Sequence, residues 1–92
     1  MTKTRNRLAI IKDMLTVIRD KGASAKPTHI MYKSNLSHKM LITYLDELIL
    51  KGFVEATEEK DQKKYLITDK GLNYLRDYRS VQNFIDSFGL DE

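Results

Sequence analysis

The chain has 92 residues, 41% of them hydrophobic, and its formal net charge is +3. This length suits one small domain with a modest core, and the absence of cysteine excludes disulfides and thiolate metal sites. The polar, basic N-terminus resembles no secretory signal, and no apolar run is long enough to cross a bilayer, so we expect a cytoplasmic protein without a membrane partner.

The first predicted helix runs from about Arg5 to Lys21, with Gly22 as its stop. Its apolar residues form two adjacent stripes at spacings of three and four: Leu8, Ile11, Leu15 and Ile18 in one, and Ile10, Met14 and Val17 in the other. Two stripes make an apolar face wider than a surface helix needs. This helix is therefore central to the core, or it buries its second stripe against another chain.

Residues 26–55 have the pattern of a helix, a tight turn and a second helix. A short helix begins near Pro27, which a first helical turn tolerates, and ends near Lys33. Asn35 suits a left-handed turn position, Leu36 would enter the core, and Ser37 is a good N-cap for a helix over residues 38–51. The core face of that helix carries Leu41, Tyr44, Leu45 and Leu48, and its opposite face carries His38, Lys39, Ile42, Thr43 and Asp46.

After Gly52, residues 53–57 and 64–68 read as two strands joined by the charged connection EEKDQK. Thr68 or Asp69 then caps a last helix that reaches about Phe88. This order predicts a mostly α, α+β fold: a winged helix-turn-helix with a two-stranded wing. We expect a DNA-binding domain over residues 1–68 and a dimerisation helix over residues 69–92.

The last helix carries a heptad-like seam of large apolar residues, namely Tyr74, Tyr78, Val81, Ile85 and Phe88. Leu72 and Leu75 lie beside the seam and are expected to pack back on the domain. We interpret the seam as the interface of a homodimer, shared with the second stripe of the first helix. The alternative is that the last helix folds against the first helix of its own chain.

Three segments together resemble archaeal winged-helix DNA-binding proteins, a group of small transcriptional regulators and nucleoid-associated proteins. They are PTHIMYKSNLS, YLDELILKGFVE and a hairpin ending in YLITDKG, preceded by a basic N-terminus ahead of LAIIKDML. The resemblance covers roughly residues 5–80, and it implies that the last helix pairs two subunits in an antiparallel coiled coil. Ile42 and Thr43 depart from the family, which often has polar or basic residues there. The shorter last helix favours the regulators.

The resemblance and the charge distribution both favour double-stranded DNA as the partner. Residues 1–45 carry nine Lys/Arg against two Asp, whereas residues 46–92 carry seven Lys/Arg against eleven Asp/Glu. A basic half facing a polyanion would suit such a partner, although scattered solvated charges give the same pattern. The wing itself mixes Glu58, Glu59 and Asp61 with three lysines, which weakens its expected hold on phosphates.

Each candidate DNA contact follows from the chemistry of its side chain. Ser37 and His38 begin the reading helix and would turn free N–H groups to a phosphate or a base edge. Lys39 would bond guanine or phosphate, Thr43 a base, and Ile42 a thymine methyl group. Contacts to the DNA backbone are expected from Lys26, Tyr32 and Lys33, from the wing lysines Lys60, Lys63 and Lys64, and from a basic arm of Lys3, Arg5 and Arg7. Solvation of Lys39 and Thr43, or packing of Ile42 under the wing, are the alternatives.

No catalytic motif is present, because the carboxylates form no paired acid–base arrangement and there is no glycine-rich phosphate loop. His29 and His38 lack acidic neighbours in the sequence, so we expect no metal site. Because catalytic motifs are also missing, we expect no cofactor and no enzymatic activity. No small-molecule ligand is evident. Three functions stay open: a dimeric transcription regulator, an architectural protein of the nucleoid, and a protein–protein module that borrows the fold.

Overall fold

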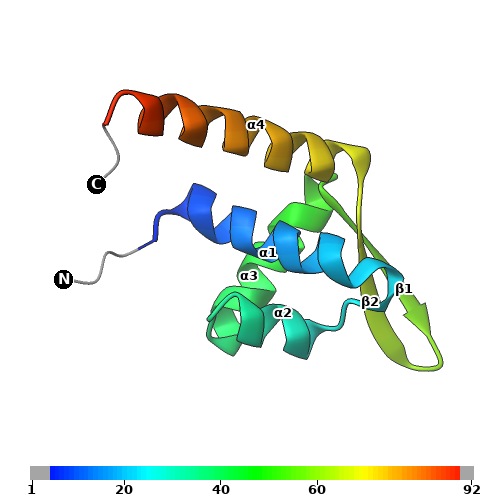
Figure 1. Cartoon of the computed structure of the whole chain (residues 1–92). Coiled ribbons are helices and arrows are strands. Elements are labelled where there is room, and N and C mark those ends of the chain that lie inside the picture. The colour runs from blue at the N-terminus through cyan, green and yellow to red at the C-terminus, as the bar shows by residue number, and fades with distance from the viewer. Residues whose placement is uncertain (1–4, 90–92) are drawn as a thin grey trace.

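The computed structural model describes residues 5–89, which form a helical body, a two-stranded hairpin and a long last helix (Figure 1). The elements in chain order are α1 (Arg7–Lys21), the 3-10 turn η1 (Gly22–Ser24), α2 (Pro27–Lys33), α3 (His38–Leu50), β1 (Val54–Glu59), β2 (Gln62–Ile67) and α4 (Asp69–Ser87). This is the predicted winged helix-turn-helix order, so the predicted fold class is confirmed.

Helix α1 lies at the centre of the core. It begins two residues later than predicted, because the side chain of Asn6 caps it by accepting from the amide of Ala9 at 2.8 Å. Both apolar stripes face the chain's own core: Ile10 and Met14 of the second stripe are buried beside Leu15 of the first. The first of the two sequence-based alternatives therefore holds, and the expectation that Ile10 and Met14 share a dimer contact is wrong.

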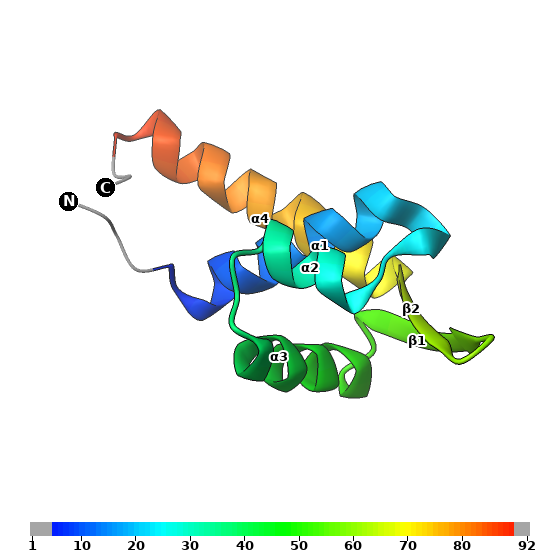
Figure 2. The same cartoon turned by 90° about the horizontal axis from the view of Figure 1, so that it is seen from below.

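The turn between α2 and α3 has the geometry that the sequence predicts. Asn35 adopts a positive φ of 55°, Leu36 is buried, and the hydroxyl oxygen of Ser37 accepts from the amide of Met40 at 3.2 Å. The left-handed backbone at Asn35, the burial of Leu36 and the Ser37 cap together fix the angle between α2 and α3. In Figure 2, α3 therefore runs along the outside of the molecule, on the other side of α1 and α2 from α4.

The wing is longer and its turn is tighter than the sequence suggests. Strands β1 and β2 pair antiparallel from Val54 opposite Ile67 to Glu59 opposite Gln62, so most of the predicted EEKDQK connection belongs to the strands. Only Lys60 and Asp61 form the turn, at φ values of 52° and 62°. Positive φ at both central residues closes a two-residue hairpin whose twist matches the strands. Ala25 adds an isolated bridge to Tyr65, which ties the wing to η1.

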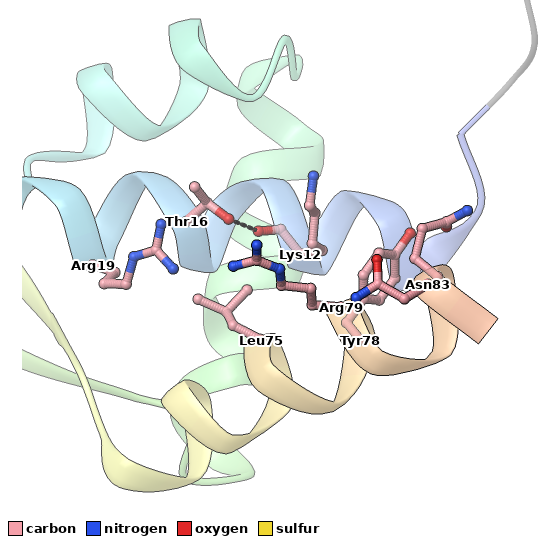
Figure 3. A pocket seen from close by; sticks show the side chains of 8 residues that line it. Lys12, Thr16, Arg19, Leu75, Tyr78, Arg79 and Asn83 are labelled. Carbon is pink, nitrogen blue, oxygen red and sulfur yellow. Dashed lines mark hydrogen bonds between the residues drawn. The ribbon is translucent and has the colours of Figure 1, made fainter. Parts of the chain in front are cut away.

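Helix α4 runs beside α1 from its capped N-terminus. The Thr68 hydroxyl donates to the Gly52 carbonyl at 2.6 Å and accepts from the Gly71 amide at 3.2 Å, so the start of α4 is tied to the end of α3. Leu75 is buried against the core, as predicted, and Figure 3 shows it beside α1 with Tyr78 on the next turn. Leu72, which is also expected to pack back on the domain, is 42% exposed and does not join the core.

Candidate nucleic-acid interface

The outer face of α3 gathers four of the residues that the sequence assigns to DNA. His38, Lys39 and Thr43 are exposed, and Ile42 is 43% exposed beside them. The Thr43 hydroxyl donates to the carbonyl of Lys39 at 3.0 Å, and in that rotamer its oxygen is left to accept. The opposite face of α3 buries Leu41, Leu45 and Leu48 in the core, so the outer face is fixed in direction. Packing of Ile42 under the wing is not observed.

Helix α2 places further polar side chains beside α3. Lys26 is the N-cap residue of α2, and Tyr32 and Lys33 lie in its last turn. All three are exposed, and Tyr32 keeps 78% of its surface open. The hydroxyl oxygen of Ser37 is already engaged, because it accepts from the amide of Met40. The sequence reasoning overlooked Met40, whose side chain is also partly exposed in the first turn of α3.

The wing lysines are set against carboxylates. Lys63 stands opposite Glu58 across the hairpin, and Lys64 stands opposite Thr57 with Glu55 and Glu59 on the same strand face. Lys60 occupies the tip, next to Asp61. Opposite charges at facing and neighbouring positions offset each other's field at a distance, so a weak phosphate grip of the wing stays our prediction.

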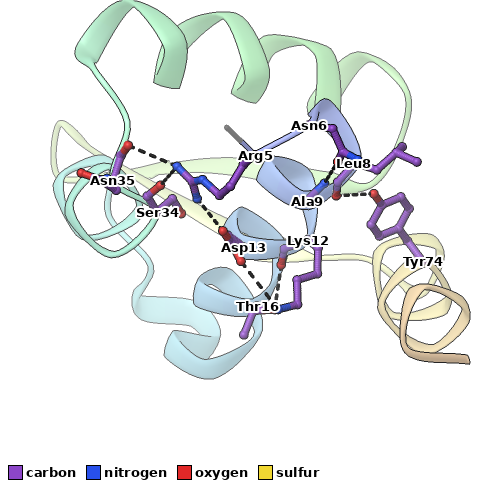
Figure 4. Close-up of polar contacts among 10 residues, drawn as sticks. All are labelled: Arg5, Asn6, Leu8, Ala9, Lys12, Asp13, Thr16, Ser34, Asn35 and Tyr74. Carbon is purple, nitrogen blue, oxygen red and sulfur yellow. Dashed lines mark hydrogen bonds and ion pairs between the residues drawn. The ribbon is translucent and has the colours of Figure 1, made fainter. Parts of the chain in front are cut away.

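Arg5 and Arg7, which the sequence assigns to a basic arm, instead hold the fold together. Figure 4 shows the contacts of Arg5. The Arg5 guanidinium pairs with Asp13 of α1 and donates to the carbonyl oxygens of Ser34 at 2.6 Å and Asn35 at 3.2 Å. These carbonyl groups follow the last turn of α2, and carbonyl groups at the end of a helix have no N–H partner within the helix. Arg5 supplies the missing donors. The expectation that Arg5 belongs to a basic arm is wrong, because these contacts hold its guanidinium. The sequence does not indicate them, since the two acceptors lie 29 and 30 residues away. Lys3 lies outside the described residues.

Arg7 is the second of these arginines, and it joins α1 to α3 through Glu47. Glu47 also lies 3.1 Å from Lys51, one turn further along α3. Hydrogen bonds first from Arg7 and then from Lys51 hold the pKa of the Glu47 carboxyl below its ordinary value. The same contact raises the pKa of Arg7. Arg7 therefore helps to fix α3 against α1, and its charge is not free for an arm.

The face of α4 expected to form a dimer interface divides into two parts. Tyr74 serves its own chain, because its hydroxyl donates to the carbonyl of Leu8 at 2.7 Å and its ring packs edge-on against Phe53. Beyond Tyr78, which stacks on Tyr74, the helix has large apolar side chains in the open. Val81 is 57% exposed and Phe88 65% exposed, and Ile85 is half-buried. Part of α4 thus folds against α1, as the alternative interpretation holds.

Sequence reasoning also missed Phe84, which is 62% exposed and contacts Phe88 with ring centroids 5.0 Å apart. Its spacing of three from Val81 and four from Phe88 was the available signal. An apolar groove of about 350 Å³ continues this surface toward the start of α1, where Leu8 faces Tyr78, Val81 and Ile85. Leu8 is half-exposed there, although the stripe to which it belongs is otherwise buried.

Among residues 5–89, no group of three or more His, Asp or Glu side chains is placed to hold a metal ion. In the same range no helix is both long and apolar enough to cross a membrane.

Comparison with solved structures finds the same fold in other proteins. Sso10a-2, a DNA-binding protein from Sulfolobus solfataricus, superposes with a TM-score of 0.76 at 23% identity, over 92% of this chain and 90% of that one. AF1382 from Archaeoglobus fulgidus gives 0.70 at 18% identity, over 87% and 90%. The MarR family transcriptional regulator SPO1453 from Silicibacter pomeroyi gives 0.61 at 14% identity, over 88% and 60%.

At these identities the likeness shows a common fold. No curated protein sequence matches. A family described as winged helix-turn-helix, however, matches residues 4–86, which is most of the chain. The element order, the capped α3 and the two-residue wing turn agree with that match, and the chain therefore belongs to the winged helix-turn-helix family.

Proposed function

We propose that this protein is a dimeric DNA-binding transcriptional regulator that reads the major groove with α3. The observation that carries the proposal is the outer face of α3, where His38, Lys39, Ile42 and Thr43 lie together while the opposite face is held in the core. An α-helix fits the major groove, and a cation, a hydroxyl and an apolar side chain can distinguish base edges there. Two of the similar folds, Sso10a-2 and SPO1453, are described as a DNA-binding protein and a transcriptional regulator.

Backbone contacts would come from both flanks of α3. Lys26, Tyr32 and Lys33 would touch phosphates on one side, and the wing would touch them on the other, with Lys60 at its tip. Ser37 and His38 would add the free N–H groups of the α3 N-terminus. The lysines of the wing lie near carboxylates, and α3 carries little charge. Each half-site would therefore bind weakly, and two subunits would be needed.

We assign the dimer contact to the exposed apolar face of α4, with a second copy of this chain as its occupant. The face comprises Tyr78, Val81, Phe84, Ile85 and Phe88, with Tyr74 at its edge. It continues into the apolar groove beside Leu8. A contiguous apolar surface of this kind marks an interaction site, and the same face repeated on a two-fold related copy is self-complementary. The two α3 helices would then read two half-sites of one duplex.

The test begins with selection of a preferred duplex from random sequences. Affinity is then measured by fluorescence anisotropy on that duplex and on a scrambled one, across a salt series. A regulator prefers the selected duplex, and a palindromic site supports the dimer. Equal affinity for both duplexes with a steep salt dependence indicates an architectural protein instead. No binding at low salt excludes both DNA-binding functions and leaves the protein–protein module as the alternative.

A matched pair of double variants tests the reading face. Lys39→Ala with Thr43→Ala should weaken binding to the selected duplex about tenfold or more and relax its preference over the scrambled one. The control is Arg76→Ala with Ser80→Ala on α4, because the Ser80 hydroxyl likewise donates to the carbonyl four residues before it, at 3.2 Å. The control should keep the preference. A preference that survives the first double variant unchanged would show that another face reads the DNA.

A further inference from the structure

A groove of about 540 Å³ lies between α1 and α4, with α3 behind α1 in the view of Figure 3. Its lining residues come from one face of each helix: Lys12, Thr16 and Arg19 from α1, and Leu75, Tyr78, Arg79, Gln82 and Asn83 from α4. This volume is in the range of sites that bind small molecules. No residue of the proposed α3 reading face lines the groove. The proposed DNA contact therefore does not account for the groove.

The groove is positively charged. Three of its lining side chains are basic and none is acidic. Within residues 5–89, Arg79 has no carboxylate within 4.0 Å. The ion pair of Arg19 is with its exposed neighbour Asp20, and Lys12 lies 3.7 Å from Asp13, which is already paired with Arg5. Among residues 5–89, Arg79 is thus the cation of the groove without a nearby carboxylate, whereas Lys12 and Arg19 each have one. A concave site lined by basic and by no acidic side chains favours an anion.

The remaining lining groups restrict the kind of anion. The Gln82 amide already donates to the Asp86 carboxylate at 3.0 Å and keeps one N–H and its oxygen. The Asn83 amide and the Tyr78 hydroxyl can each donate and accept. The Thr16 hydroxyl donates to the carbonyl of Lys12 at 2.7 Å, so its oxygen is left only to accept. Leu75 and the Tyr78 ring give an apolar surface for a carbon skeleton. We propose that this groove binds a small organic anion with two or more phosphate or carboxylate groups.

The position of the groove gives such a ligand a defined structural effect. One wall belongs to α1, at the centre of the core, and the other belongs to α4, whose outer turns extend along it. An anion that bridges Arg79 to Lys12 or Arg19 would hold α4 against the body by charge-assisted hydrogen bonds. The inference concerns binding by the protein alone and does not depend on whether α3 reads DNA.

Isothermal titration calorimetry at low ionic strength tests the site with inorganic pyrophosphate and with citrate as probes. The two probes separate phosphate from carboxylate recognition. The wild-type chain should bind at least one of them with one site per chain and more weakly as salt is added. Arg79→Gln should weaken binding at least tenfold, and Lys12→Gln should also weaken it. Arg76→Gln is the matched control, because Arg76 lies on α4 outside the groove and pairs with Asp77; it should bind as the wild type does.

Three results would overturn the proposal. The first is no saturable binding of either probe at about millimolar concentration. The second is equal weakening by Arg76→Gln and Arg79→Gln, since that indicates a general charge effect. The third is that Arg79→Gln and Lys12→Gln weaken duplex binding while probe binding is unchanged, which would make the groove a second DNA surface. Circular dichroism of each variant verifies that it is folded. Failure of the DNA-binding proposal alone would leave probe binding intact.

Discussion

The carboxylate of Glu47 on α3 pairs with the guanidinium of Arg7 in the first turn of α1. This contact joins the helix that presents the proposed reading face to the helix at the centre of the core, across forty residues of sequence. Glu47 also accepts from Lys51, so one carboxylate holds two cations. The orientation of α3 therefore depends in part on the charge of a single side chain.

Acidification should weaken the fold through Glu47. Because its folded-state pKa lies below the ordinary value of 4.5, its contribution is complete above pH 4.5 and is lost as the pH falls through the lowered value. The variant Glu47→Gln should be less stable than the wild type at neutral pH and should lose less stability on acidification. Denaturant unfolding at a series of pH values measures both effects. Glu55→Gln serves as the control, because Glu55 is exposed and has no ion pair among residues 5–89. An identical pH dependence in Glu47→Gln and the wild type would contradict this account.

Gly71 allows α4 to approach the hairpin closely. A Cβ added at this position would lie 2.6 Å from the carbonyl oxygen of Phe53, which is backbone and cannot move aside cheaply. We expect Gly71→Ala to lower the free energy of unfolding by about 1–3 kcal/mol, despite the helix propensity of alanine, which favours it by about 1 kcal/mol. Asn73→Ala, at an exposed position of the same helix, should be neutral or stabilising. If Gly71→Ala proves as stable as the wild type in urea, the start of α4 has more room than the structure indicates.

The turn of the wing carries backbone strain that a sequence change can relieve. Lys60 and Asp61 both have positive φ, a conformation that costs ordinary side chains roughly 1–2 kcal/mol. Lys60→Asn with Asp61→Gly supplies the pair preferred in this turn and should raise the free energy of unfolding by about 1 kcal/mol. Chemical denaturation gives the measurement, and Lys63→Asn, away from the turn, is the control. A loss of stability would argue against the two-residue turn.

The outer half of α4 should control association. Glutamate at position 81 or 85 would place charge in the apolar face, so Val81→Glu and Ile85→Glu should give monomers by light scattering and weaker DNA binding, since two half-sites are no longer joined. Ser80→Glu, on an exposed position outside that face, should associate as the wild type does. A wild-type chain that is monomeric at high concentration would remove this mechanism.

Much of the fold is readable in the sequence because its signals are local. Asn35 and Ser37 specify the turn before α3 through their own backbone and side-chain preferences, and both act as predicted. Thr68 similarly caps α4. The wing is harder to predict because strands on an exposed ribbon tolerate charge. The run from Glu58 to Lys63 therefore looks like a loop, although most of it is paired.

The candidate site is harder to predict than the fold, because tertiary contacts decide which of its charged side chains are free. No local pattern distinguishes Arg5, which binds carbonyls beyond α2, from Lys39, which is exposed to solvent. Phe84 was recoverable from helical spacing alone, whereas the groove lined by Lys12 and Arg79 required the packing of α4 on α1. A periodic pattern predicts the face of a helix, but it does not specify which element that face meets.

The contacts of Arg5 make a residue ahead of the first helix part of the fold. Arg5 precedes the first helical residue, yet it closes the segment from α1 to the end of α2 into a loop by contacting Ser34 and Asn35. A chain shortened to start at Arg7 would keep every helix and strand but would lose this closure and the Asn6 cap. A side chain ahead of the first regular element therefore helps to hold α1 against the turn before α3, and truncation that removes it should loosen α3 from a distance.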